Sequence, residues 1–81
     1  MARYYFDMRE GDEIAPDEEG MELTSLAKVQ EEAAHTLADM ARDTVRQYHD
    51  RNAHRMSVEV RDDDGPVLVV ACTFDVKRHR Q

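Results

Sequence analysis

Residues 25–49, SLAKVQEEAAHTLADMARDTVRQYH, contain neither glycine nor proline, and their apolar side chains recur every three or four positions. At about 100° per residue, these side chains fall on one side of a helix and most of the charged side chains fall on the other. The hydroxyl group of Thr24 or Ser25 is placed to accept a hydrogen bond from an N–H group of the first turn. The stretch therefore predicts one long amphipathic helix, whose apolar side consists of Leu26, Val29, Ala33, Leu37, Met40, Ala41, Val45 and Tyr48.

Strand-like sequence precedes this helix. Residues 3–9, RYYFDMR, alternate in character, so that Tyr4, Phe6 and Met8 share one face. Aromatic and apolar residues with a period of two indicate a half-buried strand. A second, short strand is expected around residues 20–23, at an edge of the sheet.

Two further strands are predicted after the helix. Residues 56–60, MSVEV, and 67–76, VLVVACTFDV, alternate on either side of DDDGP, which is typical of a hairpin turn. The resulting order, β-β-α-β-β, predicts a single α+β domain over residues 1–81. In this domain the helix packs on one face of a small antiparallel sheet, and the basic tail, residues 77–81, is expected to be flexible.

The segment PDEEG, residues 16–20, places negative charge just before the helix. Its proline presets φ for a turn, its aspartate can close an Asx-type turn, and its glycine can adopt a positive φ. A divalent-ion site formed by Asp17, Glu18 and Glu19 is the alternative, because oxygen ligands suit such ions. We expect the segment to be architectural and predict no metal site.

Other side chains that often carry chemistry lack the neighbours that the chemistry needs. Cys72 is the only cysteine, and strand alternation places it in the core between Val70 and Phe74, so we expect a small buried apolar side chain rather than a nucleophile. His49 and His54 are five residues apart, which does not place two imidazoles on one helical face. The chain has no glycine-rich phosphate loop, serine elbow or paired-carboxylate motif. We therefore predict no enzyme activity and no cofactor.

Charge and hydropathy limit the classes of partner. The formal net charge is −7, and residues 7–32 are strongly acidic, which disfavours nucleic acid because phosphate binding needs a basic face. No apolar run approaches the roughly 20 residues of a membrane helix. Met1-Ala2-Arg3 leads directly into strand-like sequence, so we expect no signal peptide. A cytoplasmic location is predicted.

Four segments together resemble a family of short bacterial proteins of unknown function: RYYFDMREGD, PDEEGMEL, the alanine-rich helix and VEVRDDDGPVL. Members share an RYFF-like opening, a PDEEG-type turn, one helix and a closing hairpin. The resemblance covers residues 3–76 and implies the fold without implying an activity. The chain is also loosely similar to antitoxins of the HicB type, although it lacks the extra strand and the DNA-binding segment of that family.

A single helix covers only one face of a sheet, and apolar residues are predicted on the other face. These residues are Tyr5, Val67, Val69 and Ala71, and contiguous apolar surface tends to mark a contact site. The first hypothesis is a non-catalytic interaction module that forms a homodimer through this open face or through a sheet edge. The second is an antitoxin-like regulator whose acidic N-terminal half masks a basic, RNA-cleaving partner.

Overall fold

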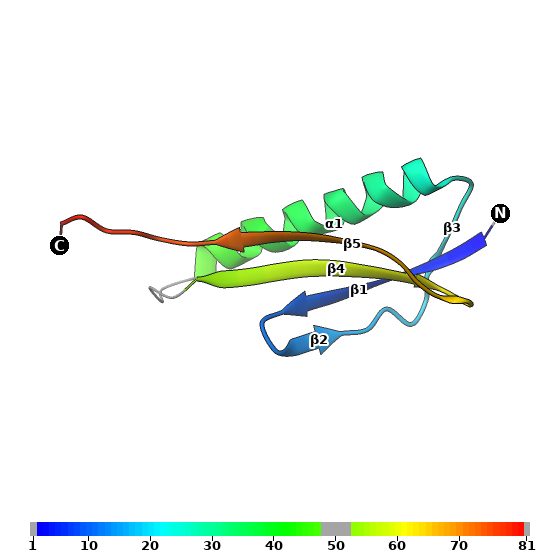
Figure 1. The fold of residues 1–81 in the computed structure, drawn as a ribbon, viewed down its shortest axis with the longest axis horizontal. Coiled ribbons are helices and arrows are strands. Elements are labelled where there is room, and N and C mark those ends of the chain that lie inside the picture. The colour runs from blue at the N-terminus through cyan, green and yellow to red at the C-terminus, as the bar shows by residue number, and fades with distance from the viewer. Residues whose placement is uncertain (1, 48–52, 81) are drawn as a thin grey trace.

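The computed structural model describes residues 2–47 and 53–80, which form a two-layer α+β domain (Figure 1). The elements are β1 (Ala2–Glu10), β2 (Glu13–Ala15), β3 (Met21–Leu23), α1 (Leu26–Gln47), β4 (His54–Asp62) and β5 (Gly65–Phe74). All strand pairs are antiparallel, and the sheet order is β2-β1-β4-β5, with β3 also paired to β1. The predicted fold class is confirmed.

The helix begins where the sequence predicts. The Ser25 Oγ accepts a hydrogen bond from the Lys28 N–H at 3.2 Å, so Ser25 rather than Thr24 is the N-cap. The predicted last two residues of the helix, 48 and 49, lie outside the described residues. Three of the predicted apolar helix residues, Val29, Ala33 and Met40, are buried.

The core lies between α1 and the face of the sheet formed by β1 and β4, and partly buried side chains of β5 pack against it. It joins the buried helix residues to one strand face, and its members are Phe6, Val29, Ala33, Met40, Met56, Val58 and Val60. Cys72 packs against this cluster, as strand alternation predicts, but it is half-buried rather than buried. Leu26 and Val45, at the two ends of α1, are largely exposed instead of buried, so the apolar side of the helix is longer than the part that packs on the sheet.

The structure adds one element that the sequence does not reveal. The segment Glu13–Ala15 forms β2, and it pairs with Met8, Arg9 and Glu10 of β1. Three residues are too few to display a period of two, so the pattern alone does not identify this strand. The expected short strand around residues 20–23 is β3.

Candidate interaction surface

The two edges of the sheet differ in length and charge. Along the outer edge of β1 lie β2 and β3, which have three residues each. At the opposite edge lies β5, which has ten residues, none of them charged. Within the described residues, β4 is the one strand that pairs with β5. Short edge strands are protected from pairing with other chains, whereas a long apolar edge is a template for such pairing.

Asp17 closes the gap between the two short strands. β2 pairs with the C-terminal end of β1 and β3 with its N-terminal end, and Phe6 lies between these two pairings. The Phe6 N–H donates to Asp17 Oδ2 at 3.2 Å. A carboxylate thus replaces the missing strand partner for the Phe6 N–H group on the outer edge of β1.

The same carboxylate shapes the 16–20 turn. Asp17 Oδ1 accepts from the N–H groups of Glu19 at 3.1 Å and Gly20 at 3.3 Å, which confirms the predicted Asx-type turn. Burial acts to raise the pKa of Asp17. The N–H donors of Phe6, Gly20 and Glu19, together with the charge of Arg61, outweigh this effect and lower the pKa below its ordinary value of 3.8.

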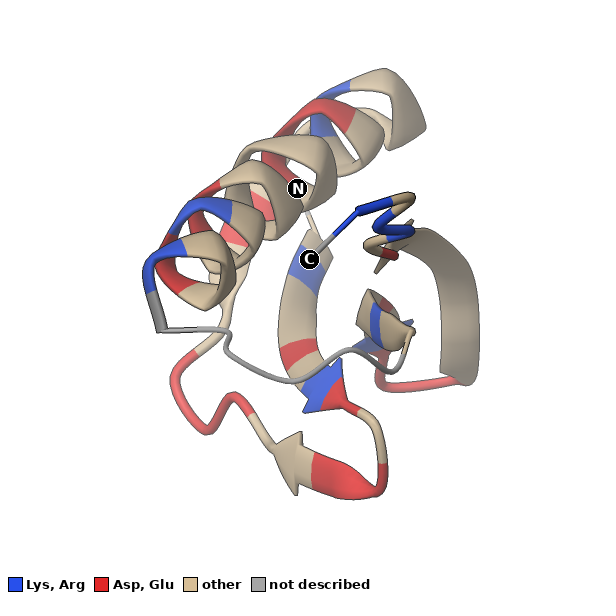
Figure 2. Cartoon of the chain, turned by 90° about the vertical axis from the view of Figure 1, so that its left-hand side faces the viewer, with Lys and Arg blue, Asp and Glu red and all other residues tan. Residues whose placement is uncertain are grey.

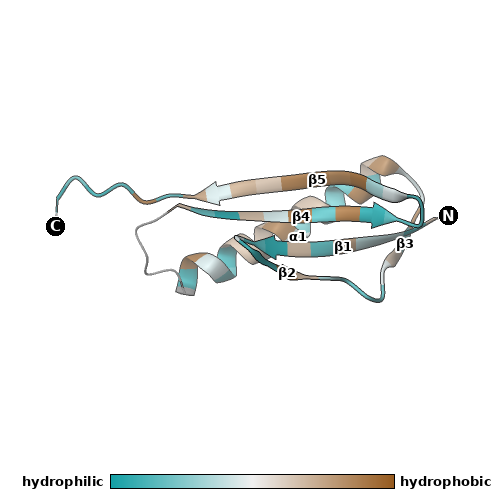
Figure 3. Cartoon of the chain, turned by 60° about the horizontal axis from the view of Figure 1, so that its bottom comes forward, coloured by the Kyte–Doolittle hydropathy of each residue, from teal (hydrophilic) through white to brown (hydrophobic). Residues whose placement is uncertain are grey.

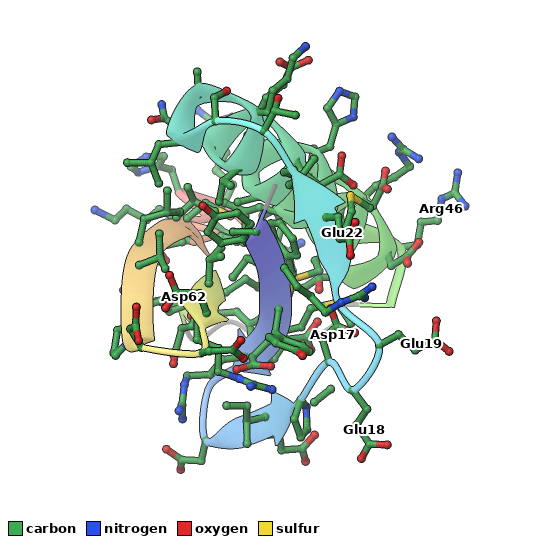
Figure 4. The ribbon with its side chains drawn as sticks, turned by 90° about the vertical axis from the view of Figure 1, so that its right-hand side faces the viewer. Asp17, Glu18, Glu19, Glu22, Arg46 and Asp62 are labelled. Atoms are coloured by element: carbon green, nitrogen blue, oxygen red, sulfur yellow. The ribbon has the colours of Figure 1, made fainter. Side chains whose placement is uncertain are left out.

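The acidic side chains of this turn do not converge on a common point. Figure 4 shows Asp17 against the sheet, while Glu18 and Glu19 point outward and apart. In residues 2–47 and 53–80, no group of three or more His, Cys, Asp or Glu side chains is arranged to hold a metal ion. The oxygens of Asp17 already accept backbone N–H groups, and these hydrogen bonds give the carboxylate an architectural role.

The β1–β4 half of the open face carries charge pairs. Arg61 Nε donates to Asp7 Oδ2 at 2.9 Å, and its guanidinium group lies 4.5 Å from the centroid of the Tyr5 ring. Arg9 Nε donates to Glu59 Oε2 at 2.6 Å. A partner that covered this half of the face would have to desolvate these ions.

The β5 half of the open face is apolar. Val69 is 57% exposed, and Ala71 is also exposed on the same side of the strand. Figure 3 shows β5 as the most hydrophobic strand, at the upper edge of the sheet in that view. Of the four residues predicted for docking, Val69 and Ala71 are the two that the structure places together on accessible apolar surface.

The other two predicted residues, Tyr5 and Val67, make contacts within the domain. Tyr5 is half-buried beneath Arg61. Val67 was expected on the open face, but it packs against the core cluster. The register between β4 and β5 shifts at Val60/Arg61, and such an irregularity breaks the simple alternation on which the expectation rested.

A separate hollow lies beside the C-terminal half of α1. It has a volume of about 300 Å³, and its apolar lining includes Met8, Ile14 and Met40. Carboxylates also line it, from Glu10, Glu13 and Asp43. The sequence shows that this region is acidic. It does not predict the hollow, because the residues that line the hollow come from three elements, β1, β2 and α1.

The comparison with known families agrees with this architecture. The sequence matches the family described as a domain of unknown function, DUF6894, over residues 3–74. The chain belongs to this family. No curated protein and no solved structure matches it. In the part of this DUF6894 domain that the structure describes, no helix is both long enough and apolar enough to cross a bilayer.

Proposed function

We propose that this DUF6894 domain is a cytoplasmic, non-catalytic protein-interaction or regulatory module that self-associates through β5. The observation that supports the proposal is the contrast between the two sheet edges. One edge is divided into short strands and closed by Asp17, whereas β5 presents ten uncharged residues. Natural sheets usually protect such an edge with charge, proline or a covering segment. In the part of the chain that the structure describes, β5 has one of these protections, Pro66 near its start, so the strand beyond this proline is suited to a partner.

The test is self-association measured by sedimentation from about 1 to 500 μM, a range that covers weak interfaces of modest area. We expect a dimer whose dissociation constant rises at least tenfold in Val69→Lys, because the substitution places charge on the proposed contact. Val45→Lys is the matched control, since the Val45 side chain is 51% exposed and belongs to α1 rather than to the edge strand. A wild-type protein that stays monomeric, or two variants that behave alike, would refute the proposal.

A second candidate function is an antitoxin-like regulator that masks a basic, RNA-cleaving protein. The acid-lined hollow favours it, because methionine side chains adapt to apolar groups while the carboxylates attract positive charge. In this reading, the hollow accepts a basic amphipathic segment of the partner.

A short synthetic peptide of alternating lysine and leucine is a suitable probe for the second candidate. We expect it to shift the amide resonances of Met8, Ile14 and Met40, and we expect the double variant Glu13→Gln/Asp43→Asn to weaken binding several-fold. A peptide with glutamate in place of lysine is the control. Equal shifts with both peptides, or none with either, would eliminate this candidate.

A further inference from the structure

We infer that two copies of the chain pair antiparallel along β5, edge to edge, and that the basic tail of each copy lies on the acidic β4–β5 turn of the other. This inference rests on the proposed function and specifies its geometry. It joins three features along one edge of the sheet: the outward side of β5, the tail that follows the strand and the turn that precedes it.

Edge pairing is favoured over stacking of the two open faces. Stacking would bury the ion pairs Arg61–Asp7 and Arg9–Glu59 against each other, which costs desolvation energy. Edge pairing leaves these ions in solvent and adds backbone hydrogen bonds to the outward side of β5. The β1 edge offers no comparable length, because β2 and β3 have three residues each.

The tail and the turn lie at opposite ends of β5. Figure 1 shows residues 75–80 continuing away from the body of the domain beyond the end of β5, and the β4–β5 turn at the far end. The tail carries Lys77, Arg78 and Arg80, and the turn carries Asp62, Asp63 and Asp64. Figure 2, which views the domain from the tail end, shows the lysine and arginine residues of the tail in blue beside the C-terminus.

A two-fold axis near the middle of β5 brings these opposite charges together. At about 3.3 Å per residue, the turn residue Asp64 lies roughly 18 Å from the centre of the strand, and Lys77 lies roughly 25 Å in the other direction if the tail stays extended. Antiparallel pairing brings these two positions to within roughly 7 Å of each other along the strand. Parallel pairing would place tail beside tail and turn beside turn, with like charges in contact.

The size of the edge explains why the tail matters. A strip about 33 Å long, estimated from ten residues, and no thicker than the shortest molecular extent of 17 Å gives at most roughly 560 Å² per chain. The total, at most roughly 1,100 Å², lies at the lower limit for a specific interface. Two tail–turn contacts add opposite charge at both ends of this strip, so the dimer should be salt-sensitive.

The test uses two charge-reversed variants of the full chain. The tail variant is Lys77→Glu/Arg78→Glu/Arg80→Glu. The turn variant is Asp63→Lys/Asp64→Lys, which keeps Asp62, whose Oδ1 accepts from the Asp64 N–H. At low salt each variant alone should dimerise at least tenfold more weakly than wild type, because its tail and turn repel. An equimolar mixture should recover the wild-type affinity, since each tail then meets a turn of opposite sign. Misfolding cannot produce such recovery.

Net charge provides a further discrimination. The turn variant replaces two −1 charges with +1, so the net charge goes from −7 to −3. If general repulsion between two acidic copies controls the affinity, this smaller net charge makes association tighter. If the tail–turn contact controls it, the same variant associates more weakly. Glu18→Lys/Glu19→Lys is the matched control, with the same change in net charge on side chains that point away from the sheet.

The outcomes separate the inference from the proposed function. Weakening in both variants with recovery on mixing supports the inference, as does slower hydrogen exchange at alternate β5 amides in the dimer. Variants that dimerise like wild type, or a mixture that does not recover, overturn the inference while the proposed self-association stands. A wild-type chain that is monomeric at low salt overturns both.

Discussion

Replacing Asp17 by alanine is expected to lower the free energy of unfolding by about 3 kcal/mol, because three backbone N–H groups lose a charged acceptor. The total free energy of unfolding for a domain of this length is roughly 4–12 kcal/mol, so the variant should unfold at a much lower urea concentration. One of the three donors is the Phe6 N–H in the middle of β1, whose loss of a partner cannot be repaired by turn rearrangement alone. Urea denaturation at pH 7 measures the change.

Two comparisons isolate the carboxylate of Asp17. Glu18→Ala, in the same turn, should change stability by no more than about 0.5 kcal/mol, because its side chain points into solvent. The fold lowers the pKa of Asp17, so its stabilisation is complete above its ordinary pKa of 3.8 and is lost as the pH falls through the folded value. The difference in the free energy of unfolding between wild type and Asp17→Ala should therefore become smaller below pH 3.8. An equal difference at pH 7 and at pH 3 would contradict this role.

The local features of the fold were predictable because their causes lie close together in the sequence. The period of 3.6 in residues 26–45 and the hydroxyl of Ser25 specify the helix without reference to the sheet. The Asx-type turn follows from Asp17 and Gly20, which are three residues apart. In each case the partner atoms belong to the same short segment, so residue type and spacing are sufficient.

The features that shape the interaction surface depend on strand register. The partners Asp7 and Arg61 are 54 residues apart, and only the pairing of β1 with β4 brings them together. The shift at Val60/Arg61 that accompanies the packing of Val67 against the core is likewise a property of two paired strands. The sequence does identify β5 as apolar. Its position at an edge depends on the order of all the strands, which local patterns do not specify.

Gly20 offers a second large effect, because it lies where the 16–20 turn approaches β1. Its φ is +74°, and a Cβ atom there would lie 2.9 Å from Tyr5 Cε1 and 3.0 Å from the Tyr4 carbonyl oxygen. We expect Gly20→Ala to destabilise the domain by about 3 kcal/mol, of which about 1 kcal/mol comes from the left-handed backbone and the rest from crowding. The carbonyl oxygen cannot move aside easily, since Tyr4 is paired with Met21 of β3.

Gly11→Ala separates the two contributions. Gly11 has a similar φ of +57°, but a Cβ atom there would have no other heavy atom within 4 Å, so the expected cost is about 1 kcal/mol from the backbone alone. The difference of about 2 kcal/mol, measured by urea denaturation of both variants, then reports the contact between the turn and β1. Equal effects would show that the turn does not hold Tyr5 in place. Tyr5 would then be available to a partner, and the interaction surface would extend from β5 across the open face.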